Sequence, residues 1–267
     1  MKPAPFDYAR PRSLDHALDL LAQDEDARAL AGGQSLVPML NFRLARPSLL
    51  IDLNPLRELE RLHVSDGTLR IGALTRQAAL LRSAEVAGRW GLLARAAAHV
   101  GHAAIRSRGT VGGSVAHADP AAELPVALTA LDARFHLRSA VGERTLTATE
   151  MFVAALTTAL APGELVTEIE VPAPPAGARM AFAEHARTHG DFALAGVAVA
   201  VTPGEHAAVA LLGAAPIPVR APAAERALLD GASRTEAGRL AADGIDDDHR
   251  RALIAALAER ALDEALG

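Results

Sequence analysis

Two glycine-rich segments contain the residues whose types and spacing best suit ligand binding. Residues 31–38 read AGGQSLVP, and residues 109–114 read GTVGGS and continue to Pro120. Glycine adopts backbone conformations closed to other residues and lets a ligand approach the main chain. A turn that opens a helix also presents free N–H groups with the positive end of the helix dipole behind them. Such a turn can hold a phosphate without any lysine.

Polar side chains in both segments add hydrogen-bond donors, namely Gln34, Ser35, Thr110 and Ser114. Two such segments could clamp the two phosphates of one dinucleotide. Alternatively, each could be only a tight turn. The residues by themselves indicate a candidate phosphate or dinucleotide site and leave both interpretations open.

Several common site motifs are absent from the sequence. There is no GxGxxG or HExxH, and a Walker A lysine is excluded because Lys2 is the only lysine. Neither Ser35 nor Ser114 stands in GxSxG. The pairs His185/His189 and His99/His102 suggest no third ligand, so we expect no metal site. With no cysteine, this chain itself has no disulfide, thiolate nucleophile or cysteine-held iron–sulfur cluster.

Composition sets the class of protein. The 267 residues are 50% hydrophobic and 22% charged, which is typical of a folded chain. Aromatic residues make up 3%, so the core must be aliphatic. The net charge of −5, with no basic run, argues against nucleic-acid binding. No secretory signal is expected in residues 1–13, and no apolar stretch reaches the roughly 20 residues of a membrane span. We therefore expect a cytoplasmic protein.

The elements that must position these segments follow from hydrophobic periodicity and turn signals. Ser13 is predicted to cap a helix whose apolar face is Leu14, Ala17, Leu18 and Leu21. The other predicted helices are residues 35–44, 75–81, 92–100, 124–131, 223–229, 236–242 and 249–266. The predicted strands are residues 27–31, 49–53, 68–73, 134–138, 164–171, 180–185, 192–201 and 207–212. The linker PAPPAG at residues 172–177 separates a last α+β unit, and residues 109–114 are expected to form a loop.

The two glycine segments, extended to residues 31–54 and 105–125, resemble the FAD-binding medium subunit of the molybdenum hydroxylases, such as carbon monoxide dehydrogenase and the xanthine dehydrogenase family. The resemblance continues through PGELVTEIEVP at residues 162–172 and HGDFALAGVAV at residues 189–199, and less distinctly through residues 211–231. It implies an α+β fold with a two-subdomain FAD-binding part (PCMH/vanillyl-alcohol-oxidase-like). The subdomains would be residues 1–54 and 55–175. A C-terminal α+β domain at residues 178–267, with a three-stranded antiparallel sheet and a helical bundle, would follow.

The resemblance also implies which residues contact FAD. In the family the first segment and its helix bind the pyrophosphate, and the second segment embraces the cofactor. An acidic residue that contacts the nucleotide corresponds to Glu123, and Phe192 would approach the isoalloxazine ring unless it is a core aromatic. Asp119 either turns the chain before Pro120 or orders the FAD loop. The expected cofactor contacts are Leu30, Ala31, Gly32, Gly33, Gln34, Ser35, Leu36, Thr110, Val111, Gly112, Gly113, Ser114, Ala118, Asp119, Glu123, Leu165 and Phe192.

The function implied by the resemblance is electron transfer by an oxidoreductase subunit. FAD on this chain would accept electrons from two [2Fe–2S] clusters on a small partner subunit and pass them to an external acceptor. A large partner subunit would carry the molybdenum cofactor, and the family assembles as a dimer of heterotrimers, a heterohexamer. Such a role needs no catalytic acid, base or nucleophile from this chain. The missing cysteines agree with clusters held elsewhere.

Two other readings stay open. The chain could be a self-contained FAD oxidoreductase for a small organic substrate, although Tyr8 is the only tyrosine available as a proton donor. It could also be a scaffold that has lost FAD.

The sequence departs from the family in two places. No lysine or arginine occupies Phe182, Ala183 or Glu184, where some members carry a basic residue near the flavin, and His99 stands where an aromatic sometimes packs on adenine. Arg106, Arg108 and Arg187 could face the cofactor, but solvent, a partner or a surface ion pair is the simpler expectation.

Overall fold

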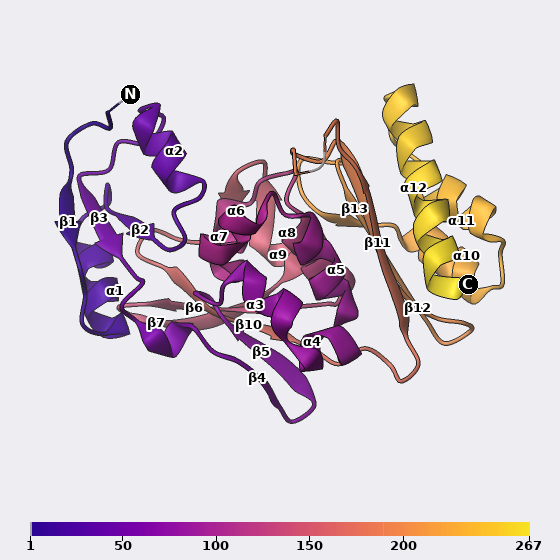
Figure 1. Cartoon of the computed structure of the whole chain (residues 1–267), viewed down its shortest axis with the longest axis horizontal. Helices are drawn as coiled ribbons and strands as arrows, with labels where there is room; N and C mark the ends of the chain where they lie inside the picture. The colour runs from indigo at the N-terminus through magenta and orange to yellow at the C-terminus, as the bar shows by residue number, and fades with distance from the viewer. Residues whose placement is uncertain (1, 189) are drawn as a thin grey trace.

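The N-terminal unit is a small parallel sheet with two helices. A computed structural model describes residues 2–188 and 190–267 (Figure 1). Ser13 caps the first helix by accepting the N–H of His16, and the four residues predicted for its apolar face are all buried. The sheet has the order β1-β3-β2. The elements are β1 (Asp7–Ala9), α1 (Leu14–Gln23), β2 (Arg28–Leu30), α2 (Leu36–Asn41) and β3 (Leu49–Asp52).

The central unit is a five-stranded antiparallel sheet covered by short helices, with the strand order β4-β5-β10-β6-β7. Its strands are β4 (Leu62–Ser65), β5 (Thr68–Gly72), β6 (Arg134–Ser139), β7 (Gly142–Thr147) and β10 (Leu165–Val171). Its helices are η1 (Arg57–Leu59), α3 (Gln77–Arg82), α4 (Ala84–Arg89), α5 (Gly91–His99), α6 (Ala103–Arg108), α7 (Val111–His117), α8 (Glu123–Ala130) and α9 (Ala148–Met151). A hairpin of β8 (Phe152–Ala154) and β9 (Thr157–Thr158) follows α9.

The expectation that residues 109–114 form a loop is wrong. Thr110 is the N-cap of α7, and its hydroxyl accepts the N–H of Gly113 at 3.1 Å. At Gly112, helix α7 packs against Ala73, the residue after β5, more closely than a side chain would allow. A Cβ on Gly112 would lie 2.5 Å from the Cβ of Ala73. Tertiary packing therefore overrides the poor helix propensity of glycine.

The C-terminal unit is a sheet with a helical bundle, as expected, but the sheet has four strands rather than three. Its order is β11-β12-β13-β14. The fourth strand was not predicted because it has only two residues and lies in the proline-rich run APIPVRAP. The elements are β11 (Arg179–His185), β12 (Ala195–Thr202), β13 (His206–Leu212), β14 (Val219–Arg220), α10 (Pro222–Leu229), α11 (Arg234–Ala241) and α12 (Asp248–Leu266).

This last sheet is covered on both faces. One face packs against the central helices α5 and α8, and the other against α10–α12 (Figure 1). Strand β12 is buried along almost its whole length, which explains its unbroken run of alanine and valine. Within residues 2–188 and 190–267, no helix has the length and hydropathy that a membrane crossing requires.

Trp90 anchors the start of the linker to the central unit. Its indole is 1% exposed and donates a hydrogen bond to the carbonyl oxygen of Pro172 at 3.0 Å. We expect Trp90→Phe to lower the free energy of unfolding by about 1–3 kcal/mol, because the carbonyl loses its donor and the smaller ring leaves a void. Denaturant unfolding measures this effect, and Phe42→Leu, at an exposed position, is the control. An effect of Trp90→Phe no larger than that of the control would contradict the anchor.

Candidate functional site

A cavity of about 660 Å³ lies between the N-terminal and central units. Its volume is within the range of about 300–1,000 Å³ that is typical of cofactor and small-molecule sites. Helix α2 forms one wall, and α6, α7 and the start of α8 form the opposite wall (Figure 1). The cavity therefore joins the two glycine segments, which are far apart in the sequence.

The first glycine segment offers a row of unused backbone donors. Among the residues that the structure describes, no acceptor is found for the N–H groups of residues 32–36. Gly33 makes this possible with a φ of +73°, which turns the chain into α2, while the Gln34 amide donates to the carbonyl of Gly32 at 3.2 Å. Consecutive free N–H groups at a helix start suit an anionic oxygen group. The segment therefore offers a set of unused donors to an anionic ligand.

The backbone N–H donors of the second glycine segment are already hydrogen-bonded to other groups of the protein. The N–H groups of Val111 and Gly112 bind the carbonyls of Thr75 and Ala73, both at 2.9 Å. The N–H groups of Gly113 and Ser114 bind the hydroxyl and the carbonyl of Thr110. The two segments are therefore not equivalent phosphate clamps. The first supplies the free donors, and the second forms the facing wall, to which Ser114 adds a side-chain hydroxyl.

The two segments touch at their glycines. A Cβ on Gly32 would lie 2.5 Å from the carbonyl oxygen of Arg108 and 2.9 Å from the Cα of Gly109. Both contacts are with backbone atoms, which cannot rotate away as a side chain can. Gly32 is thus required by close approach between the segments rather than by its φ angle.

Glu123 is a buried acid in the cavity wall. Its side chain lies at the start of α8 and is 7% exposed. Burial raises the pKa of its carboxyl from 4.5 to about 7, and the nearby Glu184 and Asp119 act in the same direction, while His99 opposes them. A substantial fraction of Glu123 is therefore protonated near neutral pH and can donate a hydrogen bond into the cavity.

His99 pairs with Glu184 of the C-terminal sheet. Its Nδ1 lies 3.1 Å from a carboxylate oxygen of Glu184, and its ring lies 5.3 Å from that of Phe182. The hydrogen bond to Glu184 raises the pKa of His99, although burial opposes the rise. Glu184 is one of the three residues at which some family members carry a basic residue near the flavin. The structure places His99 in a satisfied structural pair against Phe182, and the described cavity wall does not include it.

This pair makes a testable contribution to stability. Because the pKa of folded His99 lies above its ordinary value of 6.5, the stabilisation is complete below pH 6.5 and is lost as the pH rises through the folded value. We expect Glu184→Gln to lower the pKa of His99 and to cost about 1 kcal/mol near pH 6, since the imidazole is partly screened by water.

The measurement is an NMR titration of the histidine ring protons, with His99→Gln used for assignment. Glu170→Gln is the matched control, because Glu170 pairs with His136 at 3.0 Å in another sheet. A His99 pKa that is unchanged in Glu184→Gln would contradict the pairing.

The cavity wall contains most of the residues expected to contact a cofactor. They are Ala31, Gly32, Gly33, Gln34, Ser35, Leu36, Thr110, Gly112, Gly113, Ser114, Asp119, Glu123, Leu165 and Phe192. The described wall does not include three of the expected residues. Leu30 lies in β2, Val111 is fully buried in the core, and Ala118 ends α7 in a left-handed conformation with a φ of +49°.

The structure bears on two open alternatives among these residues. Phe192 is 76% exposed and precedes β12, so it is not a core aromatic. Asp119 accepts the N–H of Ala121 across Pro120 at 2.9 Å, which stabilises a turn, and it also lines the cavity, so both of its interpretations stay open.

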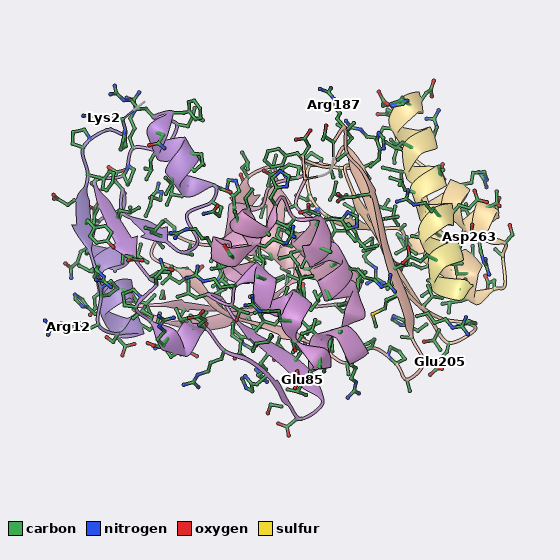
Figure 2. The ribbon with its side chains drawn as sticks, viewed as in Figure 1. Lys2, Arg12, Glu85, Arg187, Glu205 and Asp263 are labelled. Carbon is green, nitrogen blue, oxygen red and sulfur yellow. The ribbon has the colours of Figure 1, made fainter. Side chains whose placement is uncertain are left out.

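The three arginines considered from the sequence do not line the cavity. Arg106 donates to the carbonyls of Val100 and Gly101 and so braces a turn that does line it. Arg108 is exposed. Arg187 is also exposed, and Figure 2 shows its side chain pointing away from the molecule at the end of the C-terminal sheet.

The cavity also includes residues that the sequence did not single out. Leu156, at the tip of the β8–β9 hairpin, has a φ of +56° and is 56% exposed. Gln77 is buried, and its side-chain oxygen has no partner within the described residues. Neither the burial of Gln77 at the start of α3 nor the left-handed conformation of Leu156 leaves a signal in the sequence.

Within residues 2–188 and 190–267, no group of three or more histidine, cysteine, aspartate or glutamate side chains is arranged so that it could hold a metal ion. His189, one member of the pair with His185 and the first residue of HGDFALAGVAV, lies outside the described residues.

The family match covers the N-terminal and central units of the chain. Residues 4–174 match the family described as the FAD binding domain in molybdopterin dehydrogenase. The chain is 50% identical over 195 residues to the 6-hydroxypseudooxynicotine dehydrogenase complex subunit alpha of Paenarthrobacter nicotinovorans, covering 73% of this chain and 66% of that protein. It is 38% identical over 194 residues to the carbon monoxide dehydrogenase medium chain of Afipia carboxidovorans, covering 72% of this chain and 67% of that one. The matched region thus spans about two thirds of these relatives.

Solved structures match over the whole chain. A chain of carbon monoxide dehydrogenase from Hydrogenophaga pseudoflava superposes with a TM-score of 0.94 at 38% identity, covering 100% of this chain and 99% of that chain. A chain of quinoline 2-oxidoreductase from Pseudomonas putida 86 superposes with a TM-score of 0.92 at 36% identity, covering 99% and 98%.

The fold and the matched family together define an FAD-binding domain of mixed α+β architecture. The chain belongs to the family of FAD-binding medium subunits of the molybdenum hydroxylases, whose members are oxidoreductase flavoprotein subunits.

Proposed function

We propose that this chain carries FAD in the cavity between its N-terminal and central units and transfers electrons within a molybdenum-dependent dehydrogenase or hydroxylase. When bound, FAD would supply the chemistry of accepting and releasing electrons one or two at a time. The carrying observation is the row of free N–H groups at residues 32–36, which open into a cavity of about 660 Å³ inside the matched FAD-binding region.

The residues of this chain act by binding and orienting the cofactor. The first glycine segment would hold the pyrophosphate, and the α7 segment would form the opposite wall. Glu123, when protonated, would donate a hydrogen bond to the nucleotide. Phe192 and Leu156, both exposed and both lining the cavity, would meet the flavin end or cover it from water. No side chain is assigned a catalytic role.

We also propose how the chain is divided into domains. Residues 1–54 and 55–175 would be the two FAD-binding subdomains, since they contain the parallel sheet and the five-stranded sheet respectively. Residues 178–267, with the four-stranded sheet and its helices, would be the C-terminal domain.

The proposed partners follow from the family and from composition. The molybdenum cofactor would be bound by a large subunit, and two [2Fe–2S] clusters by a small subunit, because this chain has no cysteine to bind such clusters. The proposed assembly is a dimer of heterotrimers that passes electrons to an external acceptor. Its substrate would be set by the molybdenum-binding subunit.

Co-purification of the complex from its native source tests this proposal. The visible spectrum, a molybdenum and iron assay and the number of co-purifying chains are recorded under non-denaturing conditions. Flavin bands with molybdenum, iron and two further chains would support it. Flavin on a lone chain that oxidises a small organic substrate would favour a self-contained FAD oxidoreductase instead. A chain that takes up no FAD even after reconstitution would refute both and leave a scaffold.

A further inference from the structure

A chain of hydrogen bonds runs behind the cavity and connects the N-terminal unit to the central unit. It starts at Tyr8, whose hydroxyl donates to Asp52 at 2.6 Å. Burial disfavours the charged form of Asp52, but hydrogen bonds from Tyr8 and Asn54 outweigh it and hold the pKa of this carboxyl below its usual range. Asp52 therefore stays ionised and fixes Asn54, whose backbone N–H and side-chain amide both donate to it, at 3.0 and 2.6 Å.

Asn54 carries the connection into the first glycine segment. Its side-chain amide also donates to the carbonyl oxygen of Ala31 at 2.9 Å, directly before the free N–H groups. Its side-chain oxygen accepts a hydrogen bond from Arg76 at 2.7 Å. Because the amide group is held at both ends, its orientation is set by its partners.

Arg76 carries the connection to the second glycine segment. One guanidinium nitrogen binds Asn54, and the other donates to the carbonyl oxygen of Arg108 at 2.5 Å. This carbonyl is the group that a Cβ on Gly32 would meet. The planar fork of the guanidinium thus holds both sides of the closest contact between the two segments.

We propose that Arg76 is a positioning residue for FAD, an inference that rests on the proposed function. It sets the spacing of the two cavity walls while touching neither the cavity nor the cofactor. The described cavity wall includes neither Arg76 nor Asn54. Losing the fork would let the Arg108 carbonyl move relative to Gly32, so the free donors of the first segment would no longer face the opposite wall at a fixed distance. Affinity for a rigidly held ligand depends on such supporting contacts.

A second contact between the two units provides the matched control. Arg138 in β6 binds Asp15 in α1 at 3.1 Å, and neither residue lines the cavity. Arg138→Met therefore removes an arginine that bridges the same two units, but away from the glycine segments. A purely structural arginine would behave as Arg138 does.

The experiment measures the Kd of the flavin-free full chain for FAD and for ADP, which shares the diphosphate. It compares wild type with the variants Arg76→Met, Arg76→Lys, Asn54→Ala and Arg138→Met, at temperatures where all are folded by circular dichroism. We expect Arg76→Met to weaken both ligands by about 10- to 100-fold. Arg76→Lys should recover only part of the affinity, since an ammonium lacks the fork. Asn54→Ala, which keeps the arginine, should weaken both ligands in the same way and serves if Arg76→Met does not fold.

Two results would overturn the proposal while leaving the proposed function standing. In the first, the wild-type chain binds FAD, and the Kd values of the Arg76 and Asn54 variants stay within about twofold of the wild-type value. The other is an Arg138→Met chain that loses as much affinity as Arg76→Met. A wild-type chain that binds no FAD refutes the proposed function, and this inference with it.

Discussion

Replacing Gly32 with alanine is expected to weaken FAD binding by at least about 100-fold, which corresponds to about 2.7 kcal/mol. The added Cβ would lie 2.5 Å from the Arg108 carbonyl oxygen, so the two cavity walls must separate or the first segment must shift. Either change moves the free N–H groups of residues 32–36 away from their present positions. The measurement is quenching of flavin fluorescence on titration with the variant chain.

Gly88→Ala is the matched control for this variant. Gly88 lies in α4, and a Cβ there meets nothing within 4 Å. Alanine in a helix should keep or raise stability and leave FAD affinity unchanged. A Gly32→Ala chain that binds FAD as tightly as Gly88→Ala would show that the close contact between the segments does not shape the site.

Replacing Glu123 with glutamine is expected to stabilise the flavin-free chain at alkaline pH. The folded pKa of about 7 lies above the ordinary value of 4.5, so the unfolded state loses its proton first as the pH rises. Stability therefore falls between about pH 4.5 and pH 7, and the full penalty, on the order of 3 kcal/mol, is present above that window. Glutamine stays neutral and avoids the penalty.

Thermal and denaturant unfolding at pH 5 and pH 8 measures this effect. Glu123→Gln should lie within about 1 kcal/mol of wild type at pH 5 and exceed it by about 3 kcal/mol at pH 8. The exposed Glu205 provides the control variant Glu205→Gln, which should show no such pH-dependent gain. A gain that is equal at both pH values would contradict a raised pKa at Glu123. The His99–Glu184 pair also weakens with rising pH in both chains, and Glu123 raises the pKa of His99 less than Glu184 does, so most of that loss is common to the two chains.

The sequence was informative where periodicity and capping decide the structure. Ser13 and the four apolar positions after it form α1 as predicted, since a cap and an amphipathic face are local signals. Residues 172–177, expected to be a linker from their proline and glycine content, lie outside any helix or strand between β10 and β11. The strands predicted at residues 180–185, 192–201 and 207–212 correspond to β11, β12 and β13.

Features that depend on contacts distant in sequence could not be predicted. Helix α7 forms through glycines because Gly112 packs on Ala73, and nothing near Gly112 in the sequence signals that contact. The unequal roles of the two glycine segments depend on which N–H groups meet carbonyls of Ala73 and Thr75. Likewise, the pKa of Glu123 in α8 is raised mainly by burial and further by Glu184, which lies in β11 of the C-terminal sheet.

Titration of the flavin-free chain with FAD, followed by flavin fluorescence, tests the central claim most directly. We expect saturation at one FAD per chain with a Kd of about 1 μM or lower, corresponding to about 8 kcal/mol or more of binding free energy. We also expect ADP to compete with FAD, because the diphosphate would meet the N–H groups of residues 32–36. Failure to saturate, or saturation that ADP does not affect, would contradict the assignment of this cavity as a dinucleotide site held by its first glycine segment.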